Sequence, residues 1–125
     1  MADNKKILIV EDEPSLLEMY TLKLEKEGYL VVGAVDGLEG VEKAKQEKPD
    51  LILMDVMLPK IDGFHAIEEI KKEDPLKNVP VILLTNLGQD EDVKKGREFG
   101  AVDYLVKANI TPAQIAAKVA EIFKA

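Results

Sequence analysis

Short apolar runs alternate with longer amphipathic segments along the whole chain. Five runs are apolar, rich in β-branched residues and too short for a helix, which is typical of buried parallel strands. They predict strands at 7–10, 30–34, 51–54, 79–84 and 102–106. Apolar residues at helical spacing follow each run. We therefore expect helices over 14–27, from 36 to about 47, from 63 to about 73, over 90–99 and from 112 to the end.

Local signals support the positions of two of these helices. Asp36 and Glu39 are spaced as a capping pair, and so are Thr111 and Gln114, with Pro112 suited to a first helical turn. Five strands that alternate with five helices imply an α/β fold, in which helices cover both faces of a parallel sheet. Open sheets of this kind place their sites at the carboxyl ends of the strands.

The composition and charge of the chain exclude several classes of protein. A chain of 125 residues suits one domain, so we expect a single domain over 1–125. The absence of cysteine excludes a disulfide framework and a thiolate metal site. No apolar run approaches the ~20 residues needed to cross a bilayer and no signal peptide is evident, so we expect a cytoplasmic protein without a membrane partner. A net charge of −7 argues against direct nucleic-acid binding.

Polar side chains directly follow four of the five predicted strands. Glu11 and Asp12 follow the first strand, Asp55 the third, Thr85 the fourth and Lys107 the fifth. Because the carboxyl ends of parallel strands meet at one edge of a sheet, we expect these groups to share one pocket. An acid directly after an apolar run, such as Asp55, is unfavourable unless it is paired or bound to a metal.

Three carboxylates in one pocket repel one another unless some are protonated or a cation lies between them. Lys107 offsets only one charge. Hard oxygen ligands with room for water favour Mg²⁺, which binds one or two carboxylates together with phosphate oxygens. A carboxylate beside Mg²⁺ and Lys107 is also a reasonable nucleophile toward phosphorus, with the Thr85 hydroxyl stabilising the transferred oxygens.

These positions, in this order and at these spacings, resemble those of response-regulator receiver domains. The loop over 57–63 and the segment over 100–107 look like those of the family too, and the resemblance covers essentially the whole chain. It implies a flavodoxin-like, doubly wound fold with strand order 2-1-3-4-5. It also implies a regulatory domain of two-component signalling rather than an enzyme.

The resemblance implies a role for each acidic residue of the predicted pocket. Asp55 would be the phosphoacceptor, charged by a phosphohistidine on a sensor histidine kinase or a phosphotransfer protein. Glu11, Asp12 and Asp55, together with the backbone carbonyl of Met57, would hold Mg²⁺.

The remaining residues would bind the phosphoryl group and transmit its presence. Thr85 and Lys107 would bind phosphoryl oxygens, and Tyr104 matches the switch aromatic of the family. Movement of Thr85 toward the phosphoryl group would let Tyr104 turn inward and reshape the surface formed by the last two helices and the last strand. That surface would regulate a protein target that the sequence does not identify, or support a phosphorylation-dependent homodimer.

The chain departs from the family pattern at a few positions. Ala108 follows Lys107 where family members commonly have proline with a cis bond, and we expect a cis bond here because Lys107 has to reach the site. Asn86 stands where a small residue is usual. Met57 and Leu87 flank the expected path of the hydrolytic water and are both apolar, so we expect slow self-dephosphorylation.

Other functions remain to be weighed. A receiver fold used only as an unphosphorylated interaction module is the main alternative. A phosphatase of the haloacid-dehalogenase type would have a second aspartate two residues after the nucleophile, where Met57 stands. A dinucleotide-binding enzyme would have a glycine-rich loop where residues 11–14 read Glu-Asp-Glu-Pro. The pattern leaves open whether the chain is a stand-alone receiver or part of a longer regulator.

Overall fold

The computed structural model describes residues 5–85 and 90–124. These residues form one parallel sheet with the strand order β2-β1-β3-β4-β5, as the sequence predicts. The strands are β1 (Lys6–Val10), β2 (Leu30–Ala34), β3 (Leu51–Asp55), β4 (Val81–Thr85) and β5 (Asp103–Val106).

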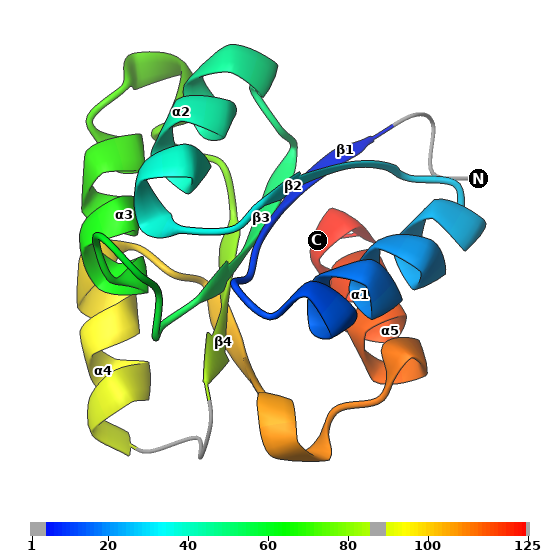
Figure 1. The fold of residues 1–125 in the computed structure, drawn as a ribbon. Helices are drawn as coiled ribbons and strands as arrows, with labels where there is room; N and C mark the ends of the chain where they lie inside the picture. The colour runs from blue at the N-terminus through cyan, green and yellow to red at the C-terminus, as the bar shows by residue number, and fades with distance from the viewer. Residues whose placement is uncertain (1–4, 86–89, 125) are drawn as a thin grey trace.

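Helices cover both faces of the sheet. Their bounds are α1 (Pro14–Lys26), α2 (Gly37–Glu47), α3 (Gly63–Lys71), α4 (Asp90–Phe99) and α5 (Pro112–Lys124), with short 3₁₀ turns η1 (Asp74–Leu76) and η2 (Lys107–Asn109). Helices α1 and α5 lie on one face, and α2, α3 and α4 lie on the other (Figure 1). Among the described helices, none is long and apolar enough to cross a membrane.

The side chains of β1 alternate between two hydrophobic clusters. Leu8 and Val10 are buried on the side of α2 and α3, whereas Ile7 and Ile9 are buried on the side of α1 and α5. The ladder continues one residue beyond the strand, where the Glu11 amide donates to the Ala34 carbonyl at 3.0 Å. Because successive residues of a strand point to opposite faces, Glu11 belongs to the side of Ile7 and Ile9.

Both predicted capping pairs form. The Asp36 Oδ1 atom accepts a hydrogen bond of 2.8 Å from the Glu39 amide, and the Glu39 side chain accepts one of 2.8 Å from the Val35 amide. At the start of α5 the pairing is reciprocal. Thr111 Oγ1 accepts from the Gln114 amide at 3.2 Å, and Gln114 Oε1 accepts from the Thr111 amide at 2.8 Å. These bonds satisfy amides that a helix leaves unpaired at its start.

The fourth strand is shorter at its start than the sequence predicts. It begins at Val81 rather than at Val79. The Val79 amide is already used, because it donates to the Leu76 carbonyl at 3.2 Å in a turn that follows η1. Pro80 then has no amide hydrogen to give to a ladder. The apolar pattern continues across this turn, so the pattern alone places the boundary too early.

Candidate functional site

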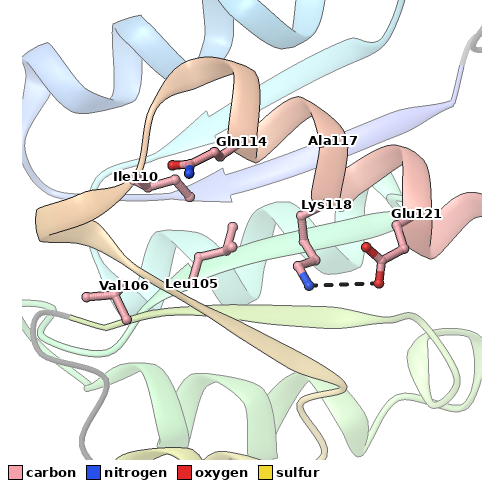
Figure 2. Close-up of a pocket in the computed structure, with 7 residues that line it drawn as sticks. All are labelled: Leu105, Val106, Ile110, Gln114, Ala117, Lys118 and Glu121. Atoms are coloured by element: carbon pink, nitrogen blue, oxygen red, sulfur yellow. Dashed lines mark ion pairs between the residues drawn. The ribbon is translucent and has the colours of Figure 1, made fainter.

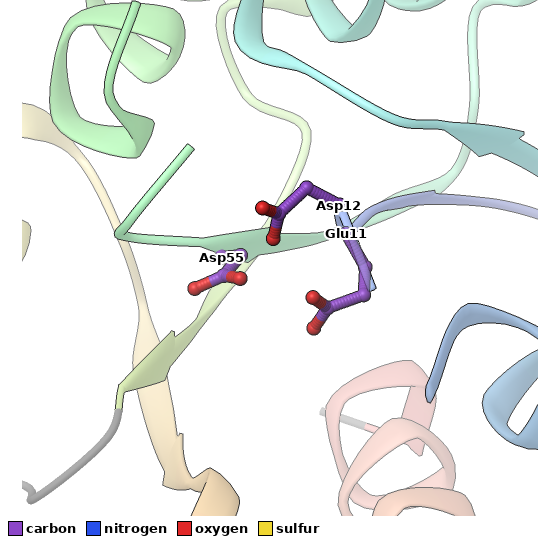
Figure 3. A group of neighbouring side chains, drawn as sticks. All are labelled: Glu11, Asp12 and Asp55. Atoms are coloured by element: carbon purple, nitrogen blue, oxygen red, sulfur yellow. The ribbon is translucent and has the colours of Figure 1, made fainter. Parts of the chain in front are cut away.

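Three carboxylates lie together at the carboxyl ends of β1 and β3. Val10 pairs with Met54 in the sheet register, so the residues that follow them, Glu11 and Asp55, are neighbours. Glu11 is fully buried, Asp55 is 2% exposed and Asp12 is exposed. One carboxylate oxygen from each lies within 4.8 Å of the others (Figure 3). The structure thus brings together the acidic groups that the sequence singles out.

Lys107 reaches the same place from the end of β5. Its Nζ atom lies 2.9 Å from Asp55 Oδ2 and 3.0 Å from Glu11 Oε1. The predicted cis bond before Ala108 is wrong, because the described residues contain no cis peptide bond. Lys107 instead begins the 3₁₀ turn η2. This turn, with an ordinary trans chain, leaves the Lys107 side chain only 11% exposed and in contact with both carboxylates.

Backbone amides complete the contacts of the two buried carboxylates. The Met57 amide donates to Asp55 Oδ1 at 3.2 Å, and the Glu13 amide donates to Glu11 Oε2 at 3.1 Å. Our sequence analysis missed both donors. The signal for the first is an aspartate at a strand end, whose carboxylate readily accepts from the amide two residues on. The Met57 side chain is 68% exposed, and the role of its carbonyl toward a metal stays a prediction.

Thr85 and Tyr104 lie on the neighbouring strands. Thr85 is the last residue of β4 and is 1% exposed, and the register pairs Asp55 with the residue before it, Leu84. The Thr85 hydroxyl donates to the Leu105 carbonyl at 3.5 Å. Tyr104 is half-buried in β5 and packs against the hydrophobic cluster on the side of α3 and α4. Thr85 thus stands one residue beyond the partner of Asp55 in the sheet, whereas Tyr104 packs on the side of α3 and α4.

Burial and neighbouring charges shift the pKa values of Glu11 and Lys107 in the site. Burial is the largest influence on Glu11, and with the charge of Asp55 it outweighs the hydrogen bond from Lys107 and raises the pKa of Glu11 to about 7. Burial also acts to lower the pKa of Lys107, but its hydrogen bonds to Asp55 and Glu11 raise the pKa above its usual value. Without a further cation, Lys107 stays charged and Glu11 is the group that tends to hold a proton.

The stability of the metal-free protein should fall as the pH rises from about 4.5 to about 7. The Glu11 carboxyl has an ordinary pKa of 4.5 and a folded pKa of about 7, so the folded state binds more protons in this window. The free energy of unfolding then decreases by up to about 3 kcal/mol, since one pKa unit corresponds to about 1.4 kcal/mol. Urea unfolding in EDTA across this range measures it. A Glu11→Gln variant that loses as much stability with pH as the wild type would contradict the assignment.

The carboxylate oxygens of Glu11, Asp12 and Asp55 are suited as ligands of a hard divalent cation. Three carboxylates face one ammonium, and all of the side-chain ligands are oxygens. Oxygen ligands of this kind are those that Mg²⁺ binds, usually with waters and phosphate oxygens. A cation there would favour ionisation of Glu11, whose burial otherwise disfavours its charge. The residues present therefore fit Mg²⁺.

A separate hollow lies between β5 and α5 (Figure 2). Leu105, Ile110 and Ala117 contribute to its lining. Lys118 also lines this hollow, and its ammonium already forms ion pairs. Its Nζ atom lies 2.9 Å from Asp103 Oδ2 and 3.8 Å from Glu121 Oε1. This hollow has none of the convergent acidic groups of the carboxylate site, so we assign the chemistry to the site at β1 and β3.

The chain is similar in sequence and in fold to known response regulators and receiver domains. The sequence model of the response regulator receiver domain matches residues 7–120. The chain is 40% identical to PhoP of Bacillus subtilis, a regulatory protein of alkaline phosphatase synthesis, over 121 residues. These residues are 97% of this chain and 49% of PhoP, so the chain spans about half the length of this relative.

Two solved structures share the fold and a similar level of identity. The chemotaxis protein CheY4 of Vibrio cholerae superposes with a TM-score of 0.90 at 30% identity, over 94% of this chain and 98% of that one. The receiver domain of a sensor histidine kinase from Pseudomonas aeruginosa gives a TM-score of 0.88 at 31% identity, over 98% and 99% of the two chains. The latter structure is described with a magnesium ion coordinated in its active-site cleft.

Proposed function

Because the chain belongs to the response regulator receiver domain family, we propose that it is a signalling switch that accepts a phosphoryl group on Asp55. The main support for this proposal is the set of contacts that Asp55 makes. Its carboxylate is 2% exposed, lies 2.9 Å from the Lys107 ammonium and belongs to the cluster with Glu11 and Asp12. An interaction module that is never phosphorylated has no need for these buried charges, which are unfavourable to fold.

We propose that Mg²⁺ is held by Glu11, Asp12, Asp55 and the backbone carbonyl of Met57. The grouped carboxylate oxygens and their excess of negative charge support this ion. The magnesium ion described in the receiver domain from Pseudomonas aeruginosa supports it too. When bound, Mg²⁺ would neutralise the carboxylates and the incoming phosphoryl oxygens.

The residues of the chain have defined parts in the transfer. An oxygen of Asp55 forms a bond to the phosphorus of a phosphohistidine while the nitrogen–phosphorus bond breaks. The imidazole leaves with the bonding electron pair and takes a proton from water. Lys107 keeps its proton, because its pKa is raised, and offsets the charge of the phosphoryl oxygens. The Thr85 hydroxyl donates a hydrogen bond to one of them.

The phosphoryl donor that we propose is a sensor histidine kinase or a phosphotransfer protein, and the output is a protein target. Thr85 and Tyr104 would form the switch, because a new charge on Asp55 acts at the end of β4 and thereby on β5. Tyr104 packs in the same cluster as Phe99 of α4, which supports a change at the surface formed by α4, β5 and α5. A homodimer formed through this surface is a second form of output.

Incubation with a small phosphodonor tests the proposed function. We expect intact-protein mass spectrometry to show the gain of one phosphate in the presence of Mg²⁺ and phosphoramidate. With EDTA in place of Mg²⁺, the gain should be strongly reduced. An unphosphorylated interaction module would show no gain in either sample. A wild-type protein that remains unlabelled with Mg²⁺ and phosphoramidate would therefore end the proposal.

Once formed, the phosphorylated protein should lose its phosphate slowly. Met57 is exposed and apolar beside Asp55, so its side chain cannot orient the hydrolytic water. Leu87, the other residue of this prediction, lies outside the described residues, and so does Asn86. We expect a lifetime of minutes or longer and a several-fold shorter one for Met57→Asn. The decay of the phosphorylated mass after removal of the donor measures both lifetimes, and decay within seconds in the wild type would contradict the prediction.

A further inference from the structure

Tyr20 carries a buried hydroxyl that the packing of the fold does not explain. Its side chain lies in α1, is fully buried and belongs to the cluster of Ile9 and Leu24. Within the described part of the chain, the hydroxyl has no hydrogen-bond partner. A buried polar group without a partner destabilises a protein by about 1–3 kcal/mol. A phenylalanine would fill the same apolar space without this penalty, so the hydroxyl requires another explanation.

The second buried oxygen without a hydrogen bond belongs to Glu11. Its Oε2 atom accepts from the Glu13 amide and from Lys107, at 3.1 and 3.3 Å. Oε1 accepts no hydrogen bond, although Lys107 Nζ lies 3.0 Å away. Among the described residues, Oε1 and the Tyr20 hydroxyl are the two buried side-chain oxygens in this condition. Glu11 Oε1 is a hydrogen-bond acceptor, and the Tyr20 hydroxyl can act as a donor.

These two oxygens lie on the same side of the sheet. Glu11 continues the face of β1 that carries Ile9, and Ile9 and Tyr20 belong to the cluster between the sheet, α1 and α5. Burial raises the pKa of Tyr20, and the charge of Glu11 is the next largest cause. The carboxylate therefore acts on the hydroxyl across a buried region, where charges are poorly screened.

We propose that Tyr20 is a positioning residue of the metal site, whose hydroxyl donates a hydrogen bond through one ordered water to Glu11 Oε1. The bond satisfies both buried oxygens and fixes the orientation of a carboxylate that would ligate Mg²⁺. Groups that orient metal ligands in this way typically contribute about 10- to 100-fold to metal affinity. The inference rests on the proposed function, because it assigns Tyr20 a role toward the same ion.

The test compares Tyr20→Phe with Tyr29→Phe. Each variant removes one phenolic hydroxyl, but Tyr29 packs against Phe123, with ring centroids 5.6 Å apart. Burial and the charge of Glu27, rather than Glu11 or Asp55, raise the pKa of Tyr29. Calorimetric titration with Mg²⁺ measures the dissociation constant, and thermal unfolding in EDTA measures the stability of the metal-free protein. We expect Tyr20→Phe to weaken Mg²⁺ binding about tenfold. Tyr29→Phe should bind Mg²⁺ as the wild type does.

The Mg²⁺ dissociation constant separates a positioning role of Tyr20 from a role in packing alone. A role in packing alone would leave the Mg²⁺ dissociation constant of Tyr20→Phe within about twofold of the wild type, and this result overturns the inference. If the wild type itself neither binds Mg²⁺ nor gains a phosphate, the proposed function fails, and the role of Tyr20 fails with it. If Tyr20→Phe does not fold, a high-resolution structure of the wild type decides. A Tyr20 hydroxyl with no oxygen at hydrogen-bonding distance then overturns the inference.

Discussion

An Asp55→Asn variant should gain no phosphate under conditions that label the wild type completely. The amide is a poor nucleophile toward phosphorus and cannot form the acyl phosphate. It also removes one of the two carboxylates that contact Lys107. Intact-protein mass spectrometry after treatment with phosphoramidate and Mg²⁺ measures the loss. We expect the labelled fraction to fall to background, which is the largest effect on function of any single substitution in the site.

Asp12→Asn is the matched control for this experiment. It makes the same chemical change in the exposed member of the carboxylate group. We expect labelling that is slower and requires more Mg²⁺, but that still reaches one phosphate per chain. Far-UV circular dichroism of both variants shows whether the fold is kept. Full labelling of folded Asp55→Asn would show that another residue accepts the phosphoryl group.

Among the variants considered, Gly63→Ala should lose the most stability. A Cβ atom at this position would lie 2.2 Å from the Asp55 carbonyl oxygen and 3.0 Å from the Val56 Cα atom. Both neighbours are backbone atoms, and the Gly63 amide donates to the Val56 carbonyl at 2.9 Å. The loop between β3 and α3 must therefore move away from the end of β3. We expect a loss of about 2–4 kcal/mol in the free energy of unfolding, measured with urea.

Gly33→Ala is the control for Gly63→Ala. Its Cβ atom would lie 3.3 Å from the end of the Leu17 side chain, which can turn aside. Since alanine is favoured over glycine inside a strand, we expect a change in stability of less than about 1 kcal/mol. Gly63→Ala should also slow labelling, because it displaces the backbone of Asp55. Equal stability and equal labelling of Gly63→Ala and wild type would contradict the close packing of this loop.

The sequence pattern predicts the sheet and the grouping of Glu11, Asp12, Asp55 and Lys107 well, for a physical reason. Strands buried on both faces are continuously apolar, so polar residues such as Asp55 and Thr85 stand out where such a run ends. Parallel strands then bring these ends to one edge. The capping pairs at Asp36 and Thr111 are equally predictable, because they depend on side chains three residues apart.

Other features depend on interactions that no local pattern encodes. The bond after Lys107 is trans, which is the strong preference of a peptide bond that is not followed by proline. What the pattern does not show is that the 3₁₀ turn η2 lets Lys107 reach the carboxylates without a cis bond. The pKa of Glu11 depends on burial and on charges from two distant strands. Tyr20 has the helical spacing of an ordinary core residue. Among the described residues, only its buried hydroxyl without a hydrogen-bond partner distinguishes it from the apolar residues around it.

The two contacts of the Lys107 ammonium join distant parts of the chain. Lys107 is 96 residues from Glu11 and 52 residues from Asp55 along the sequence. A nascent polypeptide that has formed only its first four strands has the acids but lacks their counter-charge. The proposed site is therefore complete only when β5 and Lys107 are in place, so a molecule truncated before Lys107 should accept phosphate poorly even if its acidic residues are folded.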